Sequence, residues 1–202
     1  MKKIIICALV SVLVALSIAI NLLAYTAYSV VKGDSLWGIA VKYRVGLSEI
    51  KAANPNIKNY DLIYPGQIIN VPTESQSVTS FEQKVVQLVN DVRKKNGLKA
   101  LTEDWQLSRV ARYKSQDMRD LGYFSHTSPT YGSPFEMMKS FGIKYRSAGE
   151  NIARGYPTPE AVVNAWMNSP GHKANILNSS YTHIGVGYVA SGSYWTQMFI
   201  SK

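Results

Sequence analysis

The chain opens with two lysines and a long apolar run, and this leader restricts what the rest of the chain can be. Lys2 and Lys3 precede residues 4–24, in which two serines and one asparagine are the only polar residues. A charged start followed by an apolar stretch is typical of an export signal. At about 20 residues, the stretch is also long enough to span a bilayer. We therefore predict that residues 1–27 are a signal peptide or a membrane anchor, and that the remainder lies outside the membrane.

The only cysteine, Cys7, lies inside this leader, so the exported part cannot contain an internal disulfide. Its stability must come from packing and hydrogen bonds, and a hydrophobic content of 46% allows that. The net charge of +9 indicates either a solvated basic surface or attraction to anionic wall polymers. Nucleic acid is not expected as a partner. With 202 residues, the chain can hold a small domain and a medium one.

Residues 28–72 form the first predicted domain, in the order strand, helix, helix, strand. The first strand is β-branched and alternating, and Asp34 can cap the helix that follows it. Asn54-Pro55 ends the second helix, because a residue before proline is forced out of helical geometry. The predicted elements are strands at 28–31 and 67–71 and helices at 35–43 and 47–53.

Two motifs in this domain resemble the LysM family. Tyr28-Ser-Val-Val-Lys-Gly-Asp-Ser-Leu-Trp-Gly-Ile-Ala matches its opening, and Leu62-Ile-Tyr-Pro-Gly-Gln-Ile-Ile-Asn-Val-Pro matches its close. The resemblance implies binding to glycans that contain N-acetylglucosamine, as in peptidoglycan or chitin. It also implies a groove between two loops. In this sequence the groove residues are Gly33, Asp34, Ser35 and Leu36, facing Asn56, Ile57 and Lys58.

The residue types in this groove suit a sugar ligand. Exposed backbone amides and small polar side chains can bond acetamido and hydroxyl groups, while the side chains of Leu36 and Ile57 can cover an apolar sugar face. The alternative is that Gly33 to Ser35 form only a capped turn.

A polar stretch, residues 73–79, is predicted to link this domain to a second one at residues 80–202. Apolar residues there first recur at helical spacing and later alternate. Thr79 and Glu82 can form a capping box for the first helix, and Thr158 can cap the last. Helices are predicted at 81–96, 104–121, 135–141 and 158–169, followed by a hairpin of strands 184–189 and 194–200. This order predicts an α+β fold with helices packed on an antiparallel sheet.

Three motifs of the second domain, in the same order, resemble the bacterial CAP family. This is the superfamily of cysteine-rich secretory proteins, antigen 5 and plant pathogenesis-related proteins. The motifs are His126-Thr-Ser-Pro-Thr-Tyr-Gly-Ser-Pro-Phe, Ala148-Gly-Glu-Asn-Ile-Ala and Trp166-x-x-Ser-Pro-Gly-His-Lys-Ala-Asn-Ile-Leu. The resemblance covers nearly all of residues 80–202. It implies a three-layer α-β-α sandwich with a cavity that holds two histidines and two acids.

The resemblance places His126, Glu150 and His172 in this cavity. The second acid of animal and plant members follows the tryptophan by three positions, and this sequence has Ser169 there. The departure weakens any inference about a bound metal. Glu136 and Asp117 are candidates to replace the missing acid.

The cluster of His126, Glu150 and His172 has three interpretations. Two imidazoles and a carboxylate can hold a divalent metal such as zinc with one position open. They can also act as acid and base without a metal, or form a structural cluster in which Glu150 orients both rings. The spacings match no metal motif, and no Gly-x-Ser-x-Gly motif supplies a nucleophile. No cofactor therefore follows from the spacing, and zinc is the candidate if one is bound.

Together these features predict an exported protein of the cell wall or spore envelope. Its LysM module is expected to bind peptidoglycan, and its CAP module to present a His/Glu cavity without catalysis. The alternatives are a peptidoglycan or peptide hydrolase that uses the same cavity, and a groove that binds lipid or another small ligand. Ser169, in place of an acid, favours the non-catalytic function over the hydrolase.

Overall fold

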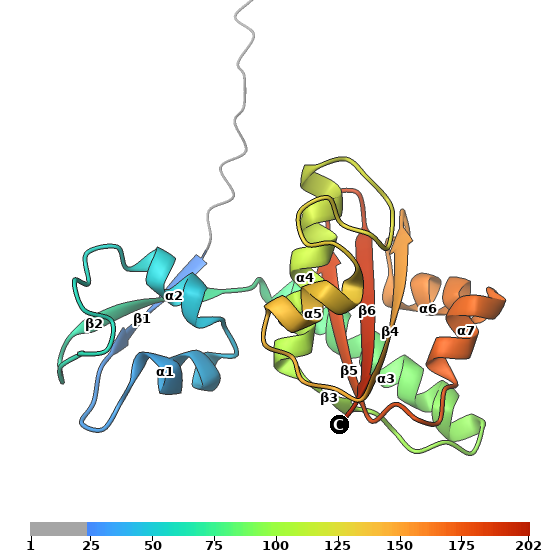
Figure 1. The fold of residues 1–202 in the computed structure, drawn as a ribbon, viewed down its shortest axis with the longest axis horizontal. Helices are drawn as coiled ribbons and strands as arrows, with labels where there is room; N and C mark the ends of the chain where they lie inside the picture. Colours follow the sequence, from blue (N-terminus) through green and yellow to red (C-terminus); the bar gives the residue numbers. More distant parts are fainter. Residues whose placement is uncertain (1–23) are drawn as a thin grey trace, which may run out of the picture.

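A computed structural model describes residues 24–202, which form two modules separated by Glu74 and Ser75 (Figure 1). We call residues 24–73 the N-terminal module and residues 76–202 the C-terminal module. Residues 1–23 of the predicted leader lie outside the described residues. Residues 24–27 belong to the first strand, so the leader as predicted, ending at residue 27, overlaps the folded module by four residues. Within residues 24–202, no helix combines the length and the hydropathy needed to cross a membrane.

The N-terminal module has the predicted order of strand, helix, helix, strand. Its elements are β1 (Ala24–Ser29), α1 (Leu36–Tyr43), α2 (Leu47–Ala53) and β2 (Ile68–Thr73). The two strands pair antiparallel, with Tyr28 opposite Ile69. The first strand begins at Ala24 rather than at Tyr28, because its pairing with β2 extends as far as Thr73.

The cap of α1 differs from the prediction. The hydroxyl of Ser35, not the carboxylate of Asp34, accepts a hydrogen bond from the N–H of Gly38 at 3.0 Å. Asp34 instead accepts from the N–H of Val31 at 2.8 Å and from the hydroxyl of Tyr28 at 2.7 Å. Asp34 therefore stabilises the turn before α1, and Ser35 caps the helix.

The N-terminal module has its own small core. Ile39, Ile50 and Ile69 are almost fully buried in it. The buried amide of Asn54 donates to the carbonyls of Ile50 at 2.7 Å and Asn70 at 2.8 Å, and accepts from the N–H of Asn70. This side chain joins α2 to β2 and satisfies backbone groups that burial would otherwise leave without partners.

The C-terminal module is built on one four-stranded sheet in the order β3-β5-β6-β4. The β3–β5 pair is parallel and the other two pairs are antiparallel. In chain order its elements are α3 (Gln76–Lys95), β3 (Thr102–Glu103), α4 (Trp105–Asp120), α5 (Pro134–Ser140), β4 (Ser147–Arg154), α6 (Pro159–Met167), α7 (Pro170–Ile176), β5 (His183–Val189) and β6 (Tyr194–Ser201).

Helices cover both faces of this sheet (Figure 1). Helices α4 and α5 lie on one face, and α3, α6 and α7 lie on the other. Neighbouring residues of a strand point to opposite faces. On β6, Trp195 and Phe199 therefore pack with α3 and α6, while Met198 and Ile200 pack with α4 and α5. The predicted α-β-α sandwich is confirmed.

Two predictions at the start of the C-terminal module are wrong. Helix α3 begins at Gln76, and the hydroxyl of Ser75 accepts from the N–H of Val78 at 3.3 Å, so Thr79 and Glu82 form no capping box. Both lie inside the helix, because it starts within the polar stretch 73–79. The carboxylate of Glu82 is buried and accepts instead from Arg112 and from the N–H of Tyr188. Two further elements, strand β4 with Glu150 and helix α7 with His172, are absent from the elements predicted from the sequence.

Candidate functional site

A cavity of about 520 Å³ runs along β4, the edge strand of the sheet. This volume lies within the range of roughly 300–1,000 Å³ that is usual for small-ligand sites. The walls come from the loop before Thr127, from β4 and the loop after it, and from α6 and α7. The lining residues are Phe124, Ser125, His126, Ile152, Ala153, Arg154, Tyr156, Ala165, Trp166, Ser169 and His172. Both histidines of the CAP-like motifs face the same cavity.

The buried carboxylate of Glu150 forms a hydrogen bond with the ring of His126. The Nδ1 of His126 donates to the Oε1 of Glu150 at 2.7 Å. The side chain of Glu150 is 1% exposed, whereas that of His126 is 53% exposed. Because Nδ1 is engaged, the ring presents Nε2 to the cavity. Glu150 thus fixes the orientation of His126 and is itself shielded from a ligand.

Burial raises the pKa of Glu150, while the hydrogen bond from His126 and the charge of Lys114 oppose that rise. The second carboxylate oxygen, Oε2, is buried and has no hydrogen-bond partner among the described residues. Burying an oxygen in this way is costly. The site therefore contains a polar atom that the surrounding residues do not satisfy.

Lys114, on α4, fixes the loop that carries His126. Its Nζ is fully buried and donates to the backbone carbonyl of His126 at 2.9 Å and to the hydroxyl of Tyr123 at 3.0 Å. Burial lowers the pKa of Lys114, and the carboxylates of Glu150 and Asp117 oppose that shift. The sequence did not point to this residue, because a lysine in an amphipathic helix usually faces solvent.

His172 reaches the cavity from the opposite face of the sheet. It lies in the first turns of α7, and burial together with the nearby His126 lowers its pKa. The amide of Asn151 donates to the carbonyl of His172 at 3.1 Å. Asn175 donates to Asn151 at 2.9 Å and to the carbonyl of Glu150 at 3.1 Å. Glu150 and Asn151 are neighbours that point to opposite faces of β4, so this strand joins both histidine-bearing segments.

Among residues 24–202, no carboxylate lines the cavity itself, and Glu150 contacts it only through His126. Ser169 lines it, at the position where relatives keep an acid. The carboxylate of Glu136 accepts from the backbone and the hydroxyl of Ser133, in the capping box of α5. Asp117 accepts from the hydroxyls of Tyr123, Ser128 and Thr130. Neither candidate therefore replaces the missing acid.

The residues present do not fit the zinc site that the sequence suggested. Within residues 24–202, no three side chains of histidine, cysteine, aspartate or glutamate are arranged to hold a metal ion. The carboxylate of Glu150 is buried, with its side chain 1% exposed, and is not available as a third ligand beside the two imidazoles. Zinc binding stays a prediction that this geometry does not support.

A serine nucleophile also lacks support. In the part of the chain that the structure describes, no serine hydroxyl is hydrogen-bonded to His126 or His172. Ser125 accepts from the N–H of Thr127, and Ser128 donates to Asp117. The arrangement provides one oriented imidazole and a second imidazole in a partly aromatic cavity. These rings can donate hydrogen bonds to a ligand and can accept hydrogen bonds from it.

The second candidate site is the groove predicted in the N-terminal module. Its two loops, after β1 and after α2, lie on the side of that module away from the C-terminal module (Figure 1). Gly33 has a φ of +96°, which suits glycine, and Asn56 and Lys58 are exposed. These loops offer polar groups and backbone to a ligand in solvent.

Two groove predictions need correction. The side chains of Leu36 and Ile57 are only 4% and 8% exposed. Both pack in the core of the N-terminal module. They cannot cover a sugar face as expected, so any contact that they make with a glycan comes from their backbone.

A three-layer sandwich with two histidines in a cavity at its edge strand defines a CAP-type module. The sequence model of the cysteine-rich secretory protein family, CAP, matches residues 86–199, and the LysM domain model matches residues 28–72. The chain belongs to the CAP family and carries a LysM domain in front of its CAP domain.

Similar proteins occur in Bacillus. The chain is 67% identical over 126 residues to the uncharacterized protein YkwD of Bacillus subtilis, covering 62% of the chain and 49% of that protein. It is 37% identical over 170 residues to the uncharacterized membrane protein YlbC of the same organism, covering 80% of the chain and 49% of the relative. An extracellular protein containing a SCP domain from Bacillus anthracis str. Ames has a TM-score of 0.60 at 34% identity, over 68% of this chain and 47% of that one. The chain thus spans about half the length of these relatives.

Proposed function

We propose that this chain is an exported protein of the cell wall or spore envelope that binds peptidoglycan through its LysM domain. The LysM match over residues 28–72 supports a ligand that contains N-acetylglucosamine. The exposed polar loops around Gly33, Asn56 and Lys58 support a site on the outer side of this domain. The extracellular relative with a similar fold supports a location outside the cell.

We propose further that the CAP cavity binds a ligand without catalysing a reaction. The observation that carries this proposal is the burial of Glu150, which orients His126 but cannot itself reach a ligand. The cavity offers Nε2 of His126, the ring of His172 and the guanidinium of Arg154 as polar groups. Phe124 and Tyr156 supply aromatic surface. These are the features of a binding site with a few oriented polar contacts.

A hydrolase acting on peptidoglycan or peptide is the second candidate. It is favoured by the oriented ring of His126, whose Nε2 faces the cavity and can accept a proton. A groove for lipid or another small ligand is the third, and the exposed ring of Phe124 favours it. Both alternatives use the same cavity as the non-catalytic function.

A turnover assay separates the first two functions. Purified peptidoglycan would be incubated with the chain and with Glu150→Gln and His172→Ala, and soluble fragments would be measured. The non-catalytic function predicts no release by any of the three. Release by the unchanged chain that both variants lose would establish the hydrolase instead.

Glycan binding is tested by sedimentation with insoluble peptidoglycan. The chain should be retained, and Asn56→Ala combined with Lys58→Ala should weaken retention. The matched variant Gln83→Ala, an exposed position on α3, should leave retention unchanged. Equal retention of all three would refute the assignment of the groove.

A further inference from the structure

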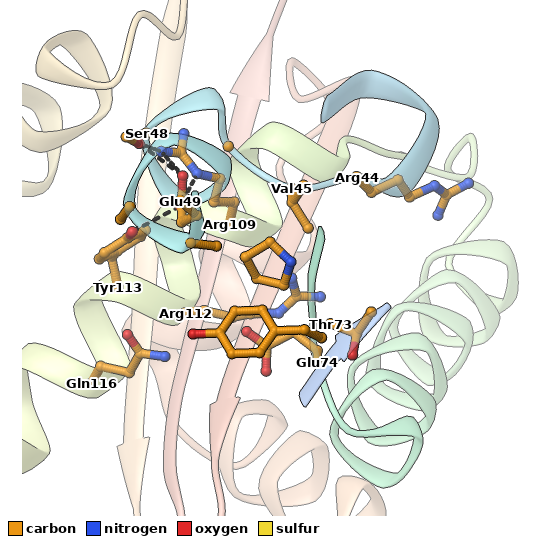
Figure 2. Close-up of a pocket in the computed structure, with 15 residues that line it drawn as sticks. Arg44, Val45, Ser48, Glu49, Thr73, Glu74, Arg109, Arg112, Tyr113 and Gln116 are labelled. Atoms are coloured by element: carbon orange, nitrogen blue, oxygen red, sulfur yellow. Dashed lines mark hydrogen bonds and ion pairs between the residues drawn. The ribbon is translucent and has the colours of Figure 1, made fainter. Parts of the chain in front are cut away.

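A second cavity, of about 580 Å³, lies between the two modules (Figure 2). It is separate from the CAP cavity and lies on the opposite side of the LysM domain from the predicted groove. Its walls come from the start of α2, from the end of β2 and from one face of α4. Ligand sites often lie at such domain interfaces.

The walls of this cavity are fixed by ion pairs. Glu49 accepts from the Nε of Arg109 at 2.5 Å and from the hydroxyl of Tyr113 at 2.8 Å (Figure 2). Arg112, one turn further along α4, donates to Glu82 at 2.6 Å. Gly46 allows the close approach, because a side chain there would overlap the guanidinium of Arg109. These contacts give the cavity a defined shape.

Several polar groups of the wall have no partner. Arg109 and Arg112 use their Nε and Nη2 atoms for carboxylates, and the Nη1 of each forms no hydrogen bond within residues 24–202. The amide of Gln116 and the carboxylate of Glu74 also face the cavity without a hydrogen bond in this part of the chain. The lining thus contains both donors and acceptors that form no hydrogen bond within residues 24–202.

The ion pairs around the cavity indicate which class of ligand it can bind. Arg109 is offset by Glu49, Arg112 by Glu82, and Arg44 faces Glu103 at 4.0 Å. Because the cations are already paired, the cavity has little attraction for a polyanion. A ligand that both donates and accepts hydrogen bonds, such as a neutral sugar with hydroxyl and acetamido groups, matches the free groups better.

The apolar part of the lining agrees with this class. Tyr25 is 52% exposed and offers an aromatic face, against which the C–H face of a sugar ring can lie. Small residues, such as Ala52 and Ala53, also line the cavity and leave room for a ligand.

We propose that the cavity between the modules is a second saccharide site, which binds N-acetylated sugar residues in addition to the groove. The class of ligand rests on the proposed function, whereas the location rests on the cavity itself. Since the two sites lie on opposite sides of the LysM domain, one molecule would contact two glycan segments. The CAP domain would then be held against the second segment through α4.

The proposal can be tested by titrating ¹⁵N-labelled protein with the tetramer of N-acetylglucosamine and following the backbone amides by NMR. The glucose tetramer, which lacks acetamido groups, is the control ligand. Gln116→Ala and Tyr25→Ala alter the cavity, Asn56→Ala alters the groove, and Gln83→Ala alters neither. Because Gln116 forms no hydrogen bond in the described chain and alanine favours helices, its replacement should preserve the fold.

The expected result is two separate sets of shifted amides, one near residues 33–36 and 56–58 and one near residues 46–49 and 116. Gln116→Ala should weaken the second set by roughly three- to tenfold, the usual effect of one lost hydrogen bond, and leave the first unchanged. Asn56→Ala should do the reverse, and Gln83→Ala should change neither.

Each other outcome has a distinct meaning. Shifts confined to the groove would overturn the second site and leave the proposed function intact. Shifts confined to the cavity would support the second site and overturn the assignment of the groove. The absence of any shift would overturn both, and equal binding of the glucose tetramer would overturn the ligand class.

Discussion

Replacing Glu49 by glutamine should loosen the contact between the two modules. Glu49 accepts four hydrogen bonds, two from Arg109 and one each from Ser48 and Tyr113. An exposed ion pair contributes about 0–1 kcal/mol, and a hydrogen bond to a charged group shielded from water about 1.5–3 kcal/mol. The side chains of Arg109 and Glu49 are 18% and 22% exposed. We therefore expect a coupling between these two residues of about 1–2 kcal/mol.

A double-mutant cycle measures this coupling. The four proteins are the unchanged chain, Glu49→Gln, Arg109→Met and the double variant. The free energy of unfolding of the N-terminal module would be read from hydrogen exchange at Ile50, a buried residue of α2. The control is Arg119→Gln, which removes a charge from the same helix, where Arg119 pairs with its neighbour Asp120.

Coupling between Glu49 and Arg119 should be zero within error. A Glu49–Arg109 coupling below about 0.3 kcal/mol, the usual limit of additivity, would refute the reasoning. The modules would then be held together by something other than this pair.

The contact should also depend on pH. Burial tends to raise the pKa of Glu49, but the hydrogen bonds from Arg109, Ser48 and Tyr113 outweigh it and lower the pKa from 4.5. A lowered pKa means that the stabilisation is complete above 4.5 and is lost as the pH falls through the lower folded-state value. Small-angle X-ray scattering should show the modules separating in this acid range. In Glu49→Gln the separation should not depend on pH there.

Three further substitutions test other parts of the structure. Lys114→Met should speed amide exchange in the loop before Thr127 and destabilise the protein by about 1–3 kcal/mol, because it leaves the carbonyl of His126 without a partner; unchanged exchange would contradict its role. Gly187→Ala should cost about 1–3 kcal/mol in urea unfolding, since its Cβ would overlap the backbone of α4. Gly171→Ala, with open space around it, should cost far less, and equal effects would refute the argument. Arg93→Met should lower the urea midpoint by the equivalent of about 2–4 kcal/mol, because three carbonyls lose a buried donor; a midpoint within error of the parent would contradict this.

The sequence predicted those elements in which apolar residues recur at a regular spacing. The helical spacing of Val85, Leu88 and Val92 predicted α3, and the apolar residues that alternate with glycine after His183 predicted β5, although that strand is buried on both faces. Strand β4 was missed, because its small and polar residues, Gly149, Glu150 and Asn151, are buried by helices on both sides of the sheet. No local pattern contains that information.

The candidate site was predictable in part. The CAP-like motifs identified His126, Glu150 and His172, and the structure places both histidines in one cavity with Glu150 behind them. The hydrogen bond between Glu150 and His126 spans 24 residues and depends on the loop geometry, which the motifs do not specify. The role of Lys114 was not predicted, because its burial depends on Tyr123 and on the loop that carries His126.

Helix α4 connects features that the sequence presents separately. One side of it holds the LysM domain through Arg109 and Tyr113, and another packs on β5 and β6. Within the same two turns, Lys114 fixes the loop of His126. A ligand that shifts the LysM domain therefore acts on the helix that positions the CAP cavity, whichever of the two saccharide sites it occupies. The chemical shift of His126 should accordingly respond to glycan binding in the unchanged chain, and this response should be lost when Glu49→Gln releases the LysM domain.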